Sequence, residues 1–167
     1  MSIDLLQFLA NKNKKSPRGY ATCYIILPDK IGVYTDGFFM VKCPVSTDKE
    51  GLYHSNGLES YLTYPSNVMA VWFKEEDIVN TITDEKILTL WYEFIKDWGA
   101  NSKTAIYYTQ DGDIEFKNTD SNKGLSLLAK PVLKSKHVKF LEKIEVYKDG
   151  VVLHCNGGVE VLLLNKA

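Results

Sequence analysis

Apolar residues recur at helical spacing at the start of the chain and then give way to strand-like stretches. In the first dozen residues they form a stripe with the period of an amphipathic helix, and Pro17 prevents its continuation. β-branched and aromatic residues then predict strands over 20–27, 31–35 and 38–45. The Asp36-Gly37 pair between the last two favours a type I′ hairpin turn. This part of the chain therefore predicts a helix followed by an antiparallel meander. The helical stripe consists of Leu5, Leu6, Phe8 and Leu9.

The clearest helical pattern lies in the middle of the chain, over 84–98. Thr83 or Asp84 is suited to cap its N-terminus, and Gly99 is suited to end it. Upstream of this helix, 68–73 is short and apolar enough to form a buried strand. The apolar stripe of the helix consists of Ile87, Leu88, Trp91, Phe94, Ile95 and Trp98.

The remaining pattern predicts a hairpin, a short strand, one more helix and three closing strands. Together with the elements above, these indicate an α+β fold with antiparallel sheets built from hairpins. A length of 167 residues fits one domain covering 1–167. In chain order the predicted elements cover 105–109, 114–116, 125–129, 136–143 (the helix), 145–147, 151–155 and 159–164.

Composition excludes several classes of protein. Hydrophobic residues make up 45% of the chain and charged residues 25%, which is typical of a folded domain and not of a disordered chain. No apolar run reaches the 18 or so residues that a membrane span needs, and the N-terminus lacks the features of a signal peptide. The three cysteines are widely spaced and form no C-x-x-C motif. We therefore expect a reduced, cytoplasmic protein with no membrane association.

Motifs for catalysis, metals and cofactors are not recognisable in the sequence. His154 and Cys155 are adjacent in a predicted strand, so their side chains point to opposite faces and cannot easily share a metal ion. No phosphate-binding loop, dinucleotide fingerprint or nucleophile elbow occurs. We therefore expect no enzymatic activity, no metal and no cofactor. A small hydrolase built on Cys155 and His154, or on a carboxylate pair, is kept as an alternative.

Charge is distributed unevenly although the whole chain carries a net charge of only −1. Residues 1–20 have a net charge of +3 and residues 123–143 of +5, whereas residues 74–97 have −4. The two basic segments are either solvated faces or a surface that follows a phosphate backbone. Lysine in place of arginine suits contacts that do not depend on base sequence. The candidate nucleic-acid-binding residues are Lys12, Lys14, Lys15, Arg18, Lys134, Lys136, Lys139 and Lys143.

Two stretches resemble a known family. The helix followed by YATCYIILPDKIGVYTDGFFMVKCPV resembles the start of a sliding-clamp domain of the bacterial DNA polymerase III β-subunit type, with Thr35-Asp36-Gly37 at its turn. The stretch KHVKFLEKIEVYKDGVVLHCNGGVEVLLLNKA is similar to the closing part of such a domain, and Tyr64-Pro65 resembles a segment midway. The chain departs from the family in lacking a Met-Pro ending after 162–165. It also has three predicted helices instead of two, so 84–98 is either an insertion or the second clamp helix.

The resemblance implies two to three helices packed on one side of antiparallel sheets, with basic residues on the helices facing DNA. It also implies subunits joined at strand edges, and hence a homo-oligomer. Our leading hypothesis is a non-enzymatic, clamp-like domain that binds duplex DNA or a replication protein. The alternative is a phage- or bacterium-encoded protein–protein interaction module without nucleic-acid contact. Its candidate surface consists of the aromatic residues Tyr53, Tyr61, Tyr64, Trp72 and Phe73.

Overall fold

A computed structural model gives the architecture of the chain. It describes residues 3–37, 39–46, 49–60, 75–97, 104–108, 114–118, 124–125, 130–133, 135–148 and 150–166. The helices are α1 (Ile3–Lys12), α2 (Glu85–Asp97) and the short α3 (Lys130–Leu133). The strands of the first half are β1 (Cys23–Leu27), β2 (Ile31–Thr35), β3 (Phe39–Pro44), β4 (Gly51–His54) and β5 (Ile78–Ile82). Those of the second half are β6 (Thr104–Tyr108), β7 (Ile114–Asn118), β8 (Gly124–Leu125), β9 (Leu141–Tyr147), β10 (Gly150–Cys155) and β11 (Glu160–Lys166).

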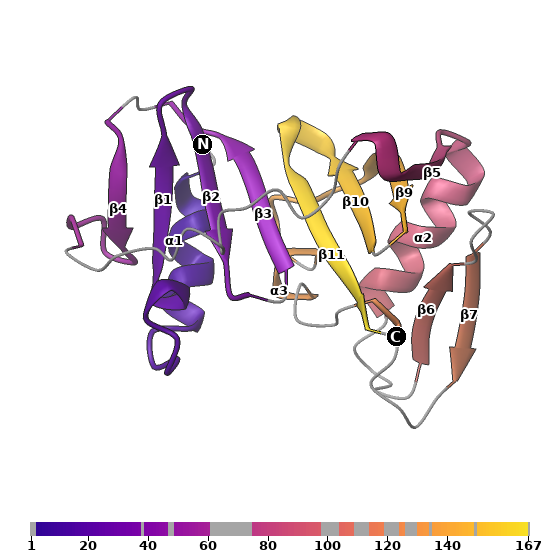
Figure 1. Cartoon of the computed structure of the whole chain (residues 1–167), viewed down its shortest axis with the longest axis horizontal. Helices are drawn as coiled ribbons and strands as arrows, with labels where there is room; N and C mark the ends of the chain where they lie inside the picture. Colours follow the sequence, from indigo (N-terminus) through magenta and orange to yellow (C-terminus); the bar gives the residue numbers. More distant parts are fainter. Residues whose placement is uncertain are drawn as a thin grey trace.

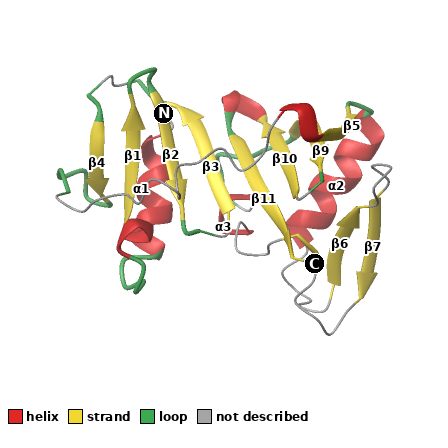
Figure 2. Ribbon diagram, in the orientation of Figure 1, coloured by secondary structure: helices red, strands yellow, loops and turns green. Residues whose placement is uncertain are grey.

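Most strands join one antiparallel sheet that runs through the whole molecule (Figure 1). This nine-stranded sheet has the order β4-β1-β2-β3-β11-β10-β9-β5, with β8 pairing to β11. β3 and β11 pair at its centre, so strands from the two ends of the chain lie side by side. β6 and β7 form a separate hairpin. The predicted α+β fold, with antiparallel hairpins and helices on one side, is confirmed (Figure 2).

The helices bury the main core against one face of the sheet. α1 packs on β1 and β2, α2 packs on β9, and α3 contacts both helices. Trp91 of α2 is fully buried in the same cluster as Leu5 and Leu6 of α1. Gly32 allows α1 to approach β2, because a Cβ at this position would clash with Leu6 and lie 2.9 Å from Val45. The side of the sheet that carries this cluster is called the helix side below.

The other face of the sheet, called the outer face below, carries a second and smaller apolar cluster. It is built from alternate residues of the same strands, as the two-residue period of a strand requires. Val151 and Leu153 of β10, for example, belong to the helix-side core, whereas Val152 belongs to the outer cluster. The buried members of the outer cluster are Val33, Met40, Tyr147, Val152 and Leu162.

Several predicted elements are confirmed. α1 buries Leu5, Leu6 and Leu9, and the predicted central helix is α2. Asp84 caps α2, since its Oδ1 accepts hydrogen bonds from the backbone N–H groups of Lys86 (2.9 Å) and Ile87 (3.2 Å). α2 is therefore the second long helix of the fold. The predicted strand at 68–73 and the ends of several other elements lie outside the described residues.

The turn between β2 and β3 differs from the prediction. A type I′ turn needs positive φ at both central residues, but only Gly37 of the pair has it, at +94°. Side chains close the loop instead. The Gly37 N–H donates to Thr35 Oγ1 (3.0 Å), and the Phe39 N–H donates to Asp36 Oδ1 (3.2 Å). The last paired residues are Thr35 and Met40, so the loop is longer than a two-residue turn.

The helix predicted over 136–143 is wrong. The chain forms α3 before this stretch and enters β9 at Leu141. Leu141 pairs with Cys155 and Lys143 pairs with His154, so Glu142 is an extra residue that makes a β-bulge. Leu141 and Ile144 both belong to the helix-side core although they are three positions apart. The bulge thus places two apolar residues three positions apart on one face, which is the spacing expected of an amphipathic helix.

Candidate nucleic-acid interface

The N-terminal basic residues gather at the end of α1. Lys12 is the last helical residue, and Lys14 and Lys15 follow in the turn. Backbone hydrogen bonds within 10–16 hold this turn, and Asn13 Nδ2 donates to the Leu9 carbonyl (3.0 Å). The exposed lysines lie where the carbonyl end of the helix dipole favours positive charge. Lysine ammonium groups at this end are therefore stabilised without a carboxylate partner.

Lys12 and Arg18 make different contacts near the end of α1. Lys12 Nζ lies 5.4 Å from the centroid of the Phe8 ring, within the range of a cation–π contact. Arg18 Nη1 donates to the Asp36 carbonyl (3.3 Å), which holds the guanidinium against the β2–β3 loop. Arg18 is therefore held beside the β2–β3 loop.

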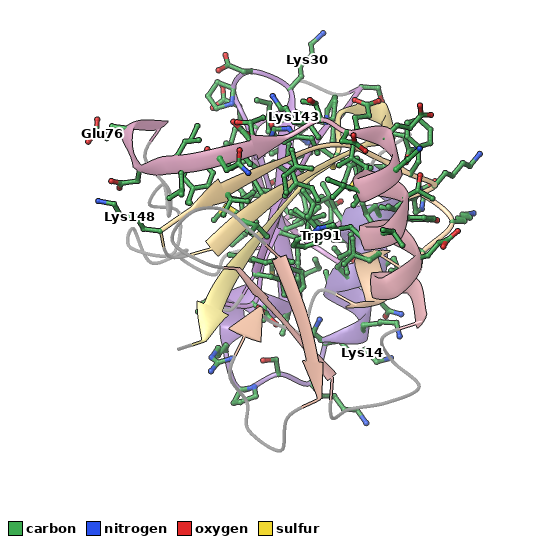
Figure 3. All side chains as sticks on the ribbon, turned by 90° about the vertical axis from the view of Figure 1, so that its right-hand side faces the viewer. Lys14, Lys30, Glu76, Trp91, Lys143 and Lys148 are labelled. Atoms are coloured by element: carbon green, nitrogen blue, oxygen red, sulfur yellow. The ribbon has the colours of Figure 1, made fainter. Side chains whose placement is uncertain are left out.

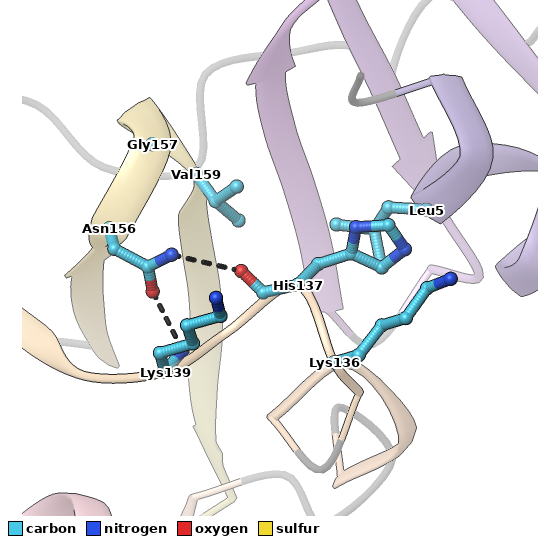
Figure 4. Close-up of a pocket in the computed structure, with 7 residues that line it drawn as sticks. All are labelled: Leu5, Lys136, His137, Lys139, Asn156, Gly157 and Val159. Carbon is cyan, nitrogen blue, oxygen red and sulfur yellow. Dashed lines mark hydrogen bonds between the residues drawn. The ribbon is translucent and has the colours of Figure 1, made fainter.

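The C-terminal basic residues lie on an irregular segment, 135–140, that one side chain fixes in place. Asn156 Oδ1 accepts hydrogen bonds from the N–H groups of Lys139 (2.7 Å) and Phe140 (3.3 Å), and its Nδ2 donates to the His137 carbonyl (3.1 Å) (Figure 4). Asn156 follows β10, so this amide joins the segment to the sheet. The exposed Lys136 and Lys139 side chains project from this segment, whose backbone is held by the Asn156 side chain.

A groove separates this segment from α1. It consists of two adjoining hollows of about 240 and 320 Å³ that share Lys136 and His137. We call the two together the α1 groove. The first hollow is lined by Leu5, Lys136, His137, Lys139, Asn156, Gly157 and Val159. The second is lined by Asp4, Phe8, Ser135, Lys136 and His137. The groove brings the two basic segments together, since Lys12 contacts Phe8 and Lys136 lines the same hollow as Phe8.

Lys143 does not share this surface. It lies in β9 opposite His154, and its neighbour Ile144 faces the helices. Because side chains alternate along a strand, Lys143 faces the outer side. Figure 3 shows Lys14 and Lys143 well apart. Lys134 lies outside the described residues.

On the outer face, a histidine lies between two carboxylates. His154 Nε2 bonds Glu145, and its Nδ1 lies 3.4 Å from a carboxylate oxygen of Glu160. Lys42 of β3 is the register partner of Glu160, and Lys143 is the register partner of His154. In the described part of the chain, no carboxylate forms an ion pair with Lys42 or Lys143, nor with the helix-side lysines. These are Lys12, Lys14, Lys15, Lys136 and Lys139.

The hydrolase alternative finds no support at Cys155 and His154. Cys155 lies in the helix-side core and is 1% exposed, whereas His154 bonds carboxylates on the outer face. Burial, reinforced by the Glu142 carboxylate, raises the pKa of the Cys155 thiol to about 12. A thiol that stays protonated, with its neighbouring imidazole on the opposite face, is not an activated nucleophile.

One residue of the aromatic surface in the interaction-module hypothesis, Tyr53, is buried in the structure. Tyr53 is 7% exposed and stacks on Tyr24, with ring centroids 5.6 Å apart. The other members of that group, Tyr61, Tyr64, Trp72 and Phe73, lie outside the described residues. Among the side chains that the structure describes, the most exposed large apolar ones are instead Leu58, Leu90 and Phe140.

Three residues of the groove were not identified as site residues from sequence. Phe8 fits the apolar stripe of α1, but its ring is 39% exposed and lines the groove. In the sequence His137 has no acidic or cysteine partner at metal-ligand spacing, and Asn156 with the two glycines that follow it predicts only a turn. No local pattern marks them, because each acquires its place from contacts between distant segments. The polar Asn156 directly after a strand, with glycines following, is the one signal that could have drawn attention to the turn.

Metal and membrane features were searched within the same residues. Among those that the structure describes, no three His, Cys, Asp or Glu side chains are grouped as a metal site requires. The described helices include none that is both long enough and apolar enough to cross a membrane.

Comparison with known proteins identifies a shared fold. The structure is similar to the crystal structure of the DNA polymerase III β-subunit from Thermotoga maritima, with 12% sequence identity and a TM-score of 0.56. The similarity covers 98% of this chain and 62% of that one, so the chain spans about 62% of the length of that subunit. No protein-family model and no curated protein matches the sequence. The clamp-like fold implied by the sequence resemblance is confirmed.

Proposed function

We propose that this chain is a non-enzymatic, clamp-like domain, 1–167, that binds the phosphate backbone of duplex DNA without reading its sequence. The observation that carries the proposal is the set of exposed helix-side lysines that no described carboxylate neutralises. They lie on the side of the sheet that carries the helices, in a fold similar to that of a DNA polymerase III β-subunit. The proposed contacts are Lys12, Lys14, Lys15, Arg18, Lys134, Lys136 and Lys139.

The chemistry of these residues suits a backbone contact. Ammonium groups on flexible stems bind phosphates as point charges, whereas reading a base in the major groove favours the bidentate fork of arginine. Arg18 is the only arginine in the chain, and its guanidinium already bonds the Asp36 carbonyl. We therefore expect binding that depends on charge and not on base sequence.

We propose also that copies of the chain associate through the ends of the sheet. β4 and β5 are the terminal strands of the sheet order. β5 reads Ile-Val-Asn-Thr-Ile, an uncharged segment of high β-propensity that can pair with another strand. A replication protein is the other partner that fits such an edge. Sedimentation at micromolar concentration measures self-association, and a monomer at all concentrations would contradict this part of the proposal.

Salt dependence of DNA binding tests the central claim. The dissociation constant for a labelled duplex is measured by fluorescence anisotropy between about 50 and 200 mM salt. Each phosphate contact contributes about 0.9 to the slope of log K against log salt concentration. The double variant Lys14→Gln/Lys15→Gln should therefore lower the slope by about 1.8.

The matched control removes the same charge from the outer face. In Lys42→Gln/Lys143→Gln, both lysines come from the outer face, away from the proposed contacts, so the slope should stay unchanged. Equal effects of both double variants would show that only net charge matters. Absence of salt-sensitive binding would refute the proposal, and a partner from cells that stays bound at high salt would favour the interaction module.

A further inference from the structure

Phe8 keeps an aromatic ring at the surface of an otherwise buried helix stripe. Its neighbours Leu5, Leu6 and Leu9 are at most 1% exposed, whereas Phe8 is 39% exposed. The ring forms one wall of the larger hollow of the α1 groove, which is about 320 Å³. Lys12 Nζ lies 5.4 Å from the ring centroid. A partly exposed ring with a cation over one of its faces therefore lines the hollow, and a base would stack on its other face.

The lining of this hollow combines three kinds of group. Phe8 is aromatic, Asp4 is acidic, and Lys136 and His137 are basic residues of this lining. Ser135 also lines it, but its hydroxyl already donates to the Val132 carbonyl (2.6 Å). The hollow thus offers an aromatic face, a hydrogen-bond acceptor with negative charge, and cations at its rim.

A nucleotide matches all three kinds of group. The π-face of a base stacks on an aromatic side chain, and lysines bind the phosphates on either side. A carboxylate accepts a hydrogen bond from the exocyclic amino group that cytosine presents. In a nucleotide the group next to Asp4 can be the uncharged base while the phosphates reach the lysines, whereas an acidic side chain that enters the hollow brings its charge next to Asp4. The mixed charge of the hollow therefore favours a nucleotide over an acidic peptide.

We infer that this hollow receives an unpaired nucleobase of a single-stranded segment, which stacks on Phe8 while Lys12 and Lys136 hold its phosphates. The inference rests on the proposed binding of DNA and makes it more specific. A base within a duplex is stacked and paired on both sides, so it cannot enter a hollow unless it is first extruded. The groove should therefore bind single-stranded or locally opened DNA more tightly than a closed duplex.

The adjoining hollow gives the strand a path along α1. Its floor is formed by the buried side chains of Leu5 and Val159, and its rim carries Lys136 and Lys139. The Asn156 amide is occupied by backbone groups of 137–140 and is not free to read a base. Contacts in this second hollow should thus be electrostatic and apolar, with little dependence on base identity.

The test compares Phe8→Leu with Phe140→Leu in the full chain. Phe140 is more exposed, at 52%, but it is absent from the lining of both hollows, so it is the matched control. Anisotropy measures binding to a labelled single strand of about 20 nucleotides and to its duplex. Phe8→Leu should weaken single-strand binding by roughly five- to a hundredfold and leave duplex binding within about twofold. Phe140→Leu should change neither, and Phe8→Trp should retain the single-strand affinity.

Each other outcome overturns the inference in a recognisable way. Unchanged single-strand binding by Phe8→Leu, with salt-sensitive duplex binding intact, would refute the stacking site and leave the proposed function standing. Equal losses for both DNAs would show that Phe8 acts through the structure of α1, and circular dichroism would report the altered fold. If neither DNA binds, the proposed function fails and the inference fails with it. Binding of a peptide of alternating Glu and Leu, lost in Phe8→Leu, would identify an acidic protein segment as the occupant instead.

Discussion

The charged side chains are arranged differently on the two faces of the sheet. On the helix side, Lys14 and Lys136 are exposed, and no described carboxylate forms an ion pair with either. On the outer face, His154 lies between Glu145 and Glu160. The helix side thus presents exposed lysines beside a groove, whereas the outer face places a carboxylate on either side of its histidine.

This difference shows why net charge is a poor guide to the partner of this chain. The total of −1 is the sum of segments whose charges range from −4 to +5. A polyanion responds to the local potential of the surface that it meets, and charges beyond about 10 Å are largely screened at ordinary ionic strength. The arrangement of lysines on one face therefore matters more than their number.

The largest effect is expected in the helix-side core. Trp91 is fully buried between α2 and the sheet, whereas Leu90 beside it is 60% exposed. Trp91→Ala should lower the free energy of unfolding by about 3–5 kcal/mol through lost burial and a cavity. Leu90→Ala should change it by about 0.5 kcal/mol or less. Urea denaturation measures both, and similar costs would break the assignment of the main core to the helix side.

A smaller effect is expected from the charge balance of the outer face. His154→Ala leaves two carboxylates facing one another and removes their shared partner, which should cost about 1–3 kcal/mol. Adding Glu145→Gln and Glu160→Gln should recover part of this loss. Such non-additive costs would show that the three side chains interact. His137→Ala is the control, because only its backbone carbonyl is engaged by Asn156. Additive costs for the three outer-face changes would show that these side chains do not interact.

An effect confined to alkaline pH concerns the burial of Cys155 on the helix side. The pKa of the Cys155 thiol is raised from 9.0 to about 12 in the folded chain. Its contribution to stability is therefore complete below pH 9.0 and is lost as the pH rises toward 12. The difference in unfolding free energy between the native chain and Cys155→Ala should shrink by about 1 kcal/mol per pH unit in this window. A constant difference would indicate that water reaches the thiol.

Local patterns predicted much of the fold correctly. The spacing of Leu5, Leu6 and Leu9 gives α1, and Asp84 begins α2 through a contact within one turn. The strand 31–35 is recognisable because β-branched and aromatic residues dominate it. In each case the signal is local and the structure follows it. The net positive charge of the two basic segments was also visible in the sequence.

Features set by distant contacts were not predictable in the same way. The side of the sheet that Lys143 faces depends on the pairing of β9 with β10, which the local sequence does not reveal. The α1 groove likewise exists only because Asn156 binds the backbone of 137–140 from another part of the chain. Phe8 looks like a core residue until the position of Lys136 is known. Sequence thus predicted the charges of the candidate site but not its surface.

The bulge at Glu142 makes the geometry of the groove sensitive to chain length. It lies directly after 135–140, and an extra residue in one strand bends that strand and increases its twist. Without Glu142, Leu141 and Lys143 would continue the regular alternation of β9, so every side chain would keep its face while the strand straightened. Deleting Glu142 would change the orientation of the segment that carries Lys136 and Lys139 relative to α1. The residues that line the groove would stay the same. The spacing of the cations is therefore adjustable by an insertion or deletion, independently of their identity.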